Sequence, residues 1–430
     1  MATRPAFLTR RFGGYLHRDV PQEDAELTHV GPGTPCGEYL RRLWQPVSFT
    51  DELHDLPVRV SLLGEELVVF RDLSGAIGLL ELHCPHRGTS LEFGLIGPKG
   101  IRCCYHAWLF DVDGTILETP GEPAESTLKD RLCHGAYPTH EYQGIVFAYM
   151  GPPDQKPPFP VYDSFARPGY RLLPGRQYFY TCNWLQIMEN AMDPVHTAFL
   201  HTIVSGTQFT DQFGVVPELE FTDTPLGMMY IATRRVGGHV WARMVEAILP
   251  NLQQVAPAWE DGHQEHPFSG PMMSRWIVPQ DDTHTMFIEF RHVSEAEGVT
   301  PSWWADRSIM LPGQLAADSY EAGQRQPGDY EAQVGQRPIA IHALEHLGAT
   351  DRGIAMFRQH VRRGIRLVQE GRDPAGLCRE AGAVIPTYAN DTVVRVLPAA
   401  TPEADQRLVR ETGRKLAEAY LKDPPLVAVP

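Results

Sequence analysis

The chain has 430 residues, of which 43% are hydrophobic and 21% are charged, and its formal net charge is −15. This length allows two to three domains, or one large one, with ample buried core. The negative charge argues against nucleic acid and anionic membranes as partners, since both would repel the protein. No apolar run reaches the roughly 18 residues of a membrane span, so we expect none.

Seven cysteines occur, at positions 36, 84, 103, 104, 133, 182 and 378. Cysteines scattered over so long a chain are not the disulfide framework of a small secreted domain. Free thiols are typical of a reducing compartment, and we therefore expect the protein in the cytoplasm.

The first 160 residues predict a short N-terminal segment followed by a small antiparallel β domain. Residues 31–35 are rich in Gly and Pro and precede a short helical pattern. β-rich runs at 58–62, 67–70 and 77–82 alternate with turns, and 110–115 reads as strand, Asp-Gly turn and strand. Prolines between 152 and 160 end this pattern. We place the segments at 1–45, 46–160 and 161–430.

Two short motifs inside the β domain offer a mixed set of metal ligands. Cys84 and His86 form C-x-H, and Cys103 and His106 form C-x-x-H. A tetrahedral zinc site could use the same donors. A Rieske [2Fe–2S] cluster, however, needs two thiolates on one iron and two neutral imidazoles on the other. Zinc sites more often pair Cys with Cys and His with His, so the spacing favours the cluster.

A second group of polar residues lies in the segment 183–201, which contains the pattern D-x-x-H-x4-H at Asp193, His196 and His201. In a regular helix the two histidines, five residues apart, would diverge by about 140°. Both can bind one metal only if the helix is irregular or ends between them, and Pro194 makes such a distortion credible. Two imidazoles and one carboxylate leave open positions on Fe(II) for O₂ and substrate.

The rest of the chain predicts strands and helices. Residues 215–295 are β-rich, with strands expected at 228–233, 273–278 and 285–290. The polar segments 255–270 and 321–338 are expected to be loops or lids. Helices are expected at 351–370 and 402–421. Asp351 begins the first of these helices, where a carboxylate can serve as a helix cap.

Both motifs resemble those of the Rieske non-haem iron ring-hydroxylating oxygenases, in their oxygenase (alpha) component. The segment CNWLQIMENAMDPVHT at 182–197 is similar to the branch that includes phthalate dioxygenase and dehydrodivanillate O-demethylase. The chain departs from the family pattern at Cys104, which follows the second ligand cysteine, and at Ala107, where the family usually has Gly. Neither departure removes a ligand.

The resemblance implies an α+β fold, with a small antiparallel β Rieske domain and a larger catalytic domain whose central antiparallel sheet is flanked by helices. It implies one [2Fe–2S] cluster and one mononuclear Fe(II) per subunit. The cluster ligands are then Cys84, His86, Cys103 and His106, and the iron ligands His196, His201 and Asp351, with Glu345 and Asp373 as weaker candidates for the third. Asn190 is expected close to the iron. Asp193 is expected to bridge His106 of one subunit and His196 of its neighbour in a head-to-tail trimer, which can stack further.

The function implied is hydroxylation or O-demethylation of an aromatic substrate, most simply an aromatic acid, with O₂ as co-substrate. The alternatives are a cis-dihydroxylating dioxygenase of the phthalate type and, remotely, a Rieske electron-transfer protein without oxygenase activity. The sequence contains no G-x-G-x-x-G fingerprint and no C-x4-C-x2-C loop, so electrons from NAD(P)H require a separate reductase, with or without a ferredoxin. Arg234, Arg243 and Arg275 lie where they could bind a substrate carboxylate, although each could equally be structural.

Overall fold

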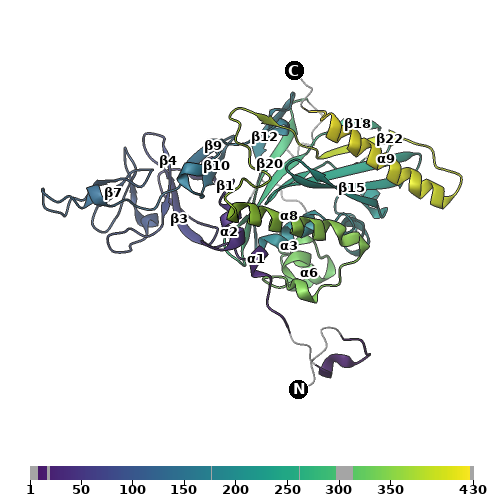
Figure 1. Cartoon of the computed structure of the whole chain (residues 1–430), viewed down its shortest axis with the longest axis horizontal. Coiled ribbons are helices and arrows are strands. Elements are labelled where there is room, and N and C mark those ends of the chain that lie inside the picture. Colours follow the sequence, from purple (N-terminus) through teal and green to yellow (C-terminus); the bar gives the residue numbers. More distant parts are fainter. Residues whose placement is uncertain (1–7, 17–19, 176, 261, 297–312, 427–430) are drawn as a thin grey trace.

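The computed structural model describes residues 8–16, 20–175, 177–260, 262–296 and 313–426. A smaller β lobe lies at the left of Figure 1 and a larger lobe of sheet and helices at the right. The fold is α+β, as the sequence predicts. Among the described residues no helix combines the length and the apolar character needed to cross a bilayer.

The smaller lobe consists of two antiparallel sheets with their own core. One sheet contains β2 (Val58–Leu62), β3 (Glu65–Arg71) and β4 (Ile77–Glu81), and the other β5 (Leu95–Ile96), β6 (Ile101–Arg102), β7 (Leu109–Phe110) and β8 (Ile116–Glu118). The β2–β3 turn has positive φ at both Leu63 and Gly64, which matches the twist of a tight hairpin. The strands predicted at 58–62, 67–70 and 77–82 are confirmed.

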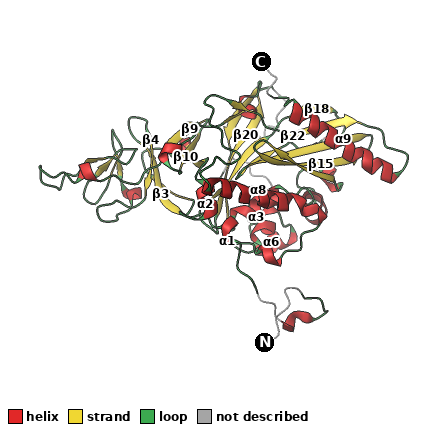
Figure 2. Cartoon of the chain, in the orientation of Figure 1, coloured by secondary structure: helices red, strands yellow, loops and turns green. Residues whose placement is uncertain are grey.

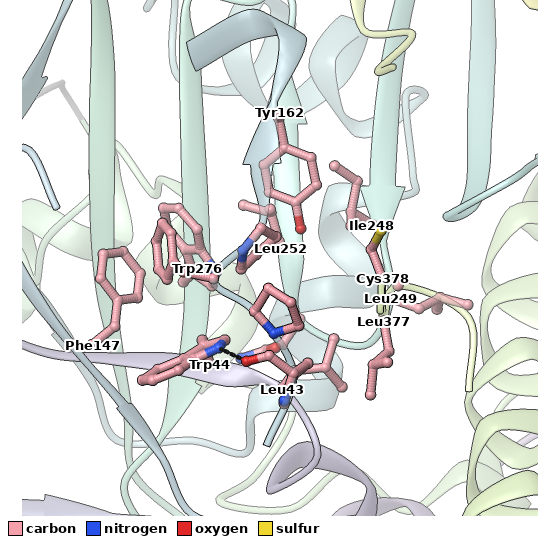
Figure 3. A pocket seen from close by; sticks show the side chains of 16 residues that line it. Leu43, Trp44, Phe147, Tyr162, Ile248, Leu249, Leu252, Trp276, Leu377 and Cys378 are labelled. Carbon is pink, nitrogen blue, oxygen red and sulfur yellow. Dashed lines mark hydrogen bonds between the residues drawn. The ribbon is translucent and has the colours of Figure 1, made fainter. Parts of the chain in front are cut away.

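A three-stranded sheet joins the two lobes. It contains β1 (Trp44–Phe49), β10 (Ile145–Tyr149) and β9 (Thr139–Tyr142), in that order. The ring of Phe147 meets that of Trp276 edge-on at 5.3 Å. A small cavity of about 30 Å³ lies at this seam, beside Trp44, whose indole N–H donates to the carbonyl of Pro157 (Figure 3). One buried core runs across the seam, so the lobes are packed as one body.

The larger lobe is built on an antiparallel sheet of long strands. Its strands, in spatial order, are β12 (Tyr170–Pro174), β20 (Thr285–Ser294), β19 (Met273–Pro279), β17 (Leu252–Val255), β16 (His239–Ile248), β15 (Gly227–Val236) and β14 (Glu218–Thr224). Three further strands join it, β13 (Tyr178–Tyr180), β18 (His266–Ser269) and β22 (Asn390–Arg395). The strands predicted at 228–233, 273–278 and 285–290 lie within β15, β19 and β20, and are confirmed.

Helices pack against this sheet (Figure 2). They include α1 (Ala25–Thr28), α2 (Pro35–Leu40), α3 (Trp184–Ala191), α8 (Arg352–Gln369) and α9 (Pro402–Lys422). The apolar stripe of α8, with Phe357, Val361 and Ile365, is buried, and α1 and α2 contact this helix. The helices predicted at 351–370 and 402–421 are confirmed, whereas the domain boundaries at 45 and 160 stay predictions.

The two segments expected to be loops contain regular structure. Residues 255–270 include β18, and residues 321–338 include most of α6 (Tyr320–Arg325) and all of α7 (Asp329–Val334). Helices of six residues are too short to show an apolar period, which is why the prediction was wrong. The start of α7 does carry a local signal, since Glu331 accepts a hydrogen bond from the backbone N–H of Gly328 at 2.9 Å.

Candidate active site

The helical segment after α3 is distorted, as the spacing of its histidines requires. The helix ends at Ala191, one turn of α-helix follows at α4 (His196–Ala198), and residues 199–204 form a π-helical turn. A π-helical turn pairs residue i with residue i+5. His196 and His201 are therefore brought to one side, with ring centroids 5.0 Å apart.

The third member of this group is Asp329, the first residue of α7. Its Oδ1 atom lies 3.6 Å from Nε2 of His196 and 3.5 Å from Nε2 of His201. The three ligand atoms lie within 4.8 Å of one another, and the His201 side chain is only 3% exposed. Two imidazoles and one carboxylate on one side of a shared space are the donor set of non-haem Fe(II) oxygenases.

Hydrogen bonds from the surrounding chain hold the ring nitrogens that face away from Asp329. Nδ1 of His201 donates to Oε1 of Gln208 at 2.6 Å, and Nδ1 of His196 donates to the backbone carbonyl of Asp193. Nε2 is then the nitrogen of each ring that faces Asp329. Oδ2 of Asp329 accepts from the amide of Gln314, so only Oδ1 faces the histidines.

The charges of the group suit a metal site. Burial alone would raise the pKa of Asp329, but the hydrogen bond and charge of His201 and the charge of His196 hold that pKa well below its ordinary value. Burial lowers the pKa of His196 despite the nearby carboxylates. Burial would also lower the pKa of His201, but its contacts with Asp329 and Gln208 raise that pKa. The site therefore presents an ionised carboxylate, an imidazole at His196 that favours the neutral form, and a His201 ring whose proton a metal would displace.

The structure does not bring Asp351 to this group, where Asp329 lies beside the two histidines instead. The carboxylate of Asp351 instead accepts from the backbone N–H of Gly348 at 2.7 Å, at the turn that precedes α8. The weaker candidates are also occupied, since Glu345 pairs with Arg358 and Asp373 with Arg379. The Asp351 side chain thus caps the turn at 349–351 and makes no capping hydrogen bond to α8 itself.

Two other predicted site residues lie beside the histidines. The side-chain amide of Asn190 donates to Oδ1 of Asp329 at 3.4 Å. The Asp193 carboxylate accepts from the backbone N–H of Val195 at 2.9 Å, and its other oxygen lies 3.8 Å from Nδ1 of His196. Asp193 is about one quarter exposed, so part of its carboxylate is open to a partner.

A large cavity opens beside the three candidate ligands. Its volume is about 1050 Å³, and its walls come from the sheet and from the segment that carries the histidines. Its aromatic lining includes Phe209, Phe213, Trp259, Phe268 and Phe287. Arg243 and Arg275 line the cavity as predicted, whereas Arg234 lies behind the wall and donates to Thr197 and to the carbonyl of Val215. A cavity of this size and lining suits an aromatic ligand.

The predicted cluster ligands lie on two loops of the smaller lobe, after β4 and after β6. Cys84 and Cys103 are each 3% exposed, and their thiols are in hydrogen-bonding contact. The His86 ring lies 4.4 Å from that of His106 and stacks on Trp108 at 4.8 Å. Nδ1 of His86 is buried and has no hydrogen-bond partner among the described residues, which fits an atom reserved for iron.

The electrostatic surroundings of these loops also fit a Rieske cluster. Burial, followed by the charges of His86 and Arg87, lowers the pKa of His106 and so favours a neutral imidazole. Burial raises the pKa of the Cys84 thiol to about 11 in the metal-free chain. Iron would have to displace that proton, which couples cluster loading to folding of the lobe.

The two cluster loops share one backbone design. The N–H of Gly88 donates to the carbonyl of Cys84, and the N–H of Ala107 donates to the carbonyl of Cys103. The fourth residue after each cysteine is left-handed, with φ of 73° at Gly88 and 60° at Ala107. The departure at Ala107 thus puts a methyl group where the backbone favours glycine.

Comparison with known proteins identifies the family. Residues 43–136 match the family described as the Rieske [2Fe-2S] domain. The oxygenase subunit of tert-butanol monooxygenase / tert-amyl alcohol desaturase from Aquincola tertiaricarbonis is 42% identical, over 94% of this chain and 90% of its own length. The alpha subunit of phenoxybenzoate dioxygenase from Ectopseudomonas oleovorans is 38% identical, over 86% and 92%. This chain belongs to the Rieske non-haem iron oxygenases.

The fold of this oxygenase agrees with that of solved relatives. NdmA of Pseudomonas putida CBB5, in its complex with caffeine, has a TM-score of 0.62 at 19% identity, covering 82% of this chain and 98% of its own. The oxygenase is an oxidoreductase that incorporates O₂, and it carries a [2Fe–2S] cluster and a mononuclear iron. The family and both cofactors predicted from the sequence are confirmed.

Replacement of each aspartate in turn by alanine tests which of Asp329 and Asp351 holds the mononuclear iron. In Asp329→Ala we expect iron to fall from about three to about two atoms per chain, with the visible spectrum of the cluster unchanged. The matched variant Asp351→Ala loses only a cap, about 0.5–2 kcal/mol of stability, and keeps its iron. Metal analysis of purified protein measures this, and the opposite pattern would restore Asp351 as the ligand.

Two small substitutions test the left-handed loop positions. A Cβ at Gly88 would meet no atom within 4 Å, so Gly88→Ala changes only the backbone preference. We expect it to destabilise the cluster-loaded protein by about 1–2 kcal/mol, and Ala107→Gly to stabilise it by a similar amount or less. Thermal unfolding compares the melting temperatures of both variants with that of the wild type. If both variants shift the melting temperature in the same direction, the two left-handed loop positions are not equivalent.

Proposed function

We propose that Cys84 and Cys103 hold one iron of the cluster and His86 and His106 the other, and that His196, His201 and Asp329 hold the mononuclear iron. Support comes from the two Nε2 atoms that face one carboxylate oxygen of Asp329 and from the buried Nδ1 of His86, which has no hydrogen-bond partner among the described residues. When bound, the two metal centres supply electron transfer and O₂ reduction. The chain itself holds the imidazole tautomers and orients the carboxylate.

We propose that the substrate is an aromatic acid, which is hydroxylated on the ring or loses a methyl group from a methoxy substituent. The observation that supports this most directly is the cavity of about 1050 Å³, which reaches the iron ligands and combines aromatic walls with arginines. The related phenoxybenzoate dioxygenase is named for such a substrate. Cis-dihydroxylation remains the alternative outcome, because it uses the same ligands.

A small tertiary alcohol is the second candidate, since the relative with 42% identity is named for tert-butanol and tert-amyl alcohol. The size of the cavity argues against it. Pockets that bind drug-sized ligands measure about 300–1,000 Å³, and an alcohol of four or five carbons would leave most of this space filled with water.

Electrons must reach the oxygenase from a separate protein, because the sequence contains no nicotinamide fingerprint and no plant-type ferredoxin loop. We propose a reductase, with or without a ferredoxin, as that partner. The free thiols support the cytoplasm as the compartment. A Rieske carrier without oxygenase activity would have no use for the three-ligand group in the larger lobe.

We also propose a head-to-tail trimer, in which the cluster lobe of one subunit lies against the iron site of the next. The two sites of one chain lie in different lobes (Figure 1). Exposed apolar side chains accompany both sites, with Tyr105 beside the cluster ligand candidate His106 and Phe199 and Ile203 in the segment of the candidate iron ligands. The half-open carboxylate of Asp193 then bridges His106 of one subunit and His196 of the other.

One turnover under ¹⁸O₂ tests the proposed reaction. Prereduced enzyme is offered phthalate-like acids, methoxylated aromatic acids and tert-butanol, and products are identified by mass. We expect a labelled hydroxylated acid, or loss of a methylene group with release of formaldehyde. A product with two labelled oxygens and two added hydrogens would establish cis-dihydroxylation. Turnover of tert-butanol alone would contradict the proposal.

Substitution of Asp193 tests the bridge between subunits. We expect Asp193→Asn to load both cofactors and keep the trimer, but to slow reoxidation of the prereduced cluster by about 10–100-fold. Stopped-flow absorbance follows the cluster, and size-exclusion chromatography follows the trimer. The control is Asp211→Asn, an exposed aspartate that accepts from Thr207. Equal reoxidation rates in both variants would refute the bridge.

A further inference from the structure

The basic side chains that line the active-site cavity differ in what they contact. Arg275 donates to Glu289 at 2.9 Å and to Gln314 at 3.2 Å. Arg243 donates to the hydroxyl of Tyr230 and to the backbone carbonyls of residues 256 and 257. Both guanidinium groups are buried within the wall and held by the protein, and Arg275 keeps one nitrogen, Nη2, without a hydrogen-bond partner among the described residues.

The buried acidic side chains that line the cavity also have partners within the protein. Asp329 faces the two histidines, and Asp391 accepts from the indole of Trp241 and from His266. Glu260 is exposed to solvent. The buried carboxylates at the cavity are thus already in contact with a donor of the chain, and none of them pairs with the remaining lining arginine, Arg167.

Arg167 is a half-buried cation without a counter-ion. In the ranges that the structure describes, its guanidinium has no hydrogen bond and no ion pair, and it stacks on the ring of Tyr170 at 3.7 Å from the centroid. Gly270 gives it room, because a Cβ there would lie 3.0 Å from Nη1 of Arg167. Burial lowers the pKa of Arg167, yet an arginine side chain stays protonated at neutral pH. A carboxylate of a ligand would supply the missing partner in a two-pronged contact.

Arg167 and the group around Asp329 contact different stretches of the cavity wall. Tyr170 lies opposite Ser294 of β20, whereas Arg275, which contacts Gln314 and through it Asp329, lies opposite Glu289 of the same strand. Five residues of a strand correspond to about 17 Å between these backbone positions. The Arg167 guanidinium reaches part of the way along this stretch, since burial and then its charge lower the pKa of His292. Two linked aromatic rings match a span along this wall better than one benzoate ring does, and the cavity of about 1050 Å³ has room for them.

We propose that Arg167 binds the carboxylate of a two-ring aromatic acid, whose distal ring then lies at the mononuclear iron. The inference rests on the proposed function and narrows it, because it names both the anchoring residue and the length of the substrate. Tyr170 positions the guanidinium by stacking, and the aromatic walls contact the rings.

Binding to the cofactor-loaded enzyme, without reductant, tests this inference separately from turnover. The ligands are biphenyl-4-carboxylate, the neutral biphenyl-4-carboxamide and benzoate, measured by isothermal titration calorimetry. We expect the wild type to bind biphenyl-4-carboxylate at least about tenfold more tightly than either of the others. Arg167→Gln should remove that preference and leave the affinity for the carboxamide unchanged.

Two further variants control for charge and for folding. Arg167→Lys keeps the charge but loses the two-pronged geometry, so we expect an intermediate affinity. Arg171→Gln removes an exposed arginine of β12 and should bind like the wild type. The inference is overturned if Arg167→Gln binds the carboxylate as tightly as Arg171→Gln does, or if benzoate binds as tightly as the two-ring acid.

Two outcomes distinguish an error in the role of Arg167 from an error in the proposed reaction. An aromatic acid that is oxygenated under ¹⁸O₂ equally well by the wild type and by Arg167→Gln, at subsaturating concentration, contradicts the role of Arg167 and leaves the proposed function standing. Binding that depends on Arg167, with oxygenation of tert-butanol alone, supports the anion site and contradicts the proposed reaction.

Discussion

The contact between one oxygen of Asp329 and two imidazoles is the constraint on which the active site depends. The two imidazoles reach that oxygen only because the chain after Pro194 leaves regular α-helical geometry and forms a π-helical turn, which superposes residues five apart. The other polar atoms of the three side chains are occupied, by a backbone carbonyl, by Gln208 and by Gln314, and Asn190 donates to the oxygen that faces the histidines. The ligand atoms are therefore oriented before any metal arrives, and little rearrangement is needed for binding.

The parts of this arrangement that depend on local chemistry could be predicted from the sequence. The two cluster loops are short, so the spacing of Cys84, His86, Cys103 and His106 is enough to bring them together. The distortion between His196 and His201 followed from the same kind of argument, because five residues do not return to one face of an α-helix. Long strands such as β15 and β20 could be read from their composition.

Other parts depend on tertiary contacts that no local pattern carries. Asp329 and Asp351 both stand at the start of a helix, but only the long helix α8 has a visible apolar period. The sequence therefore drew attention to Asp351 and not to the aspartate that lies beside the two histidines. The arginines present the same difficulty. Arg234 is enclosed by Thr197 and Val215, Arg275 is paired with Glu289, and Arg167 has no acceptor, yet nothing in the neighbouring residues distinguishes the three.

The origin of the cavity walls has a consequence for how such an enzyme can diversify. The metal-facing side chains come from the segment 196–201 and from α7, whereas Arg167 and Tyr170 come from the connection into the edge strand β12, and Gly270 from the loop before β19. Substitutions in that connection and loop can lengthen, shorten or neutralise the chamber without moving an iron-facing atom. Substitutions at a few positions far from the iron can then change which compounds bind, while the residues at the iron, where O₂ is reduced, stay the same.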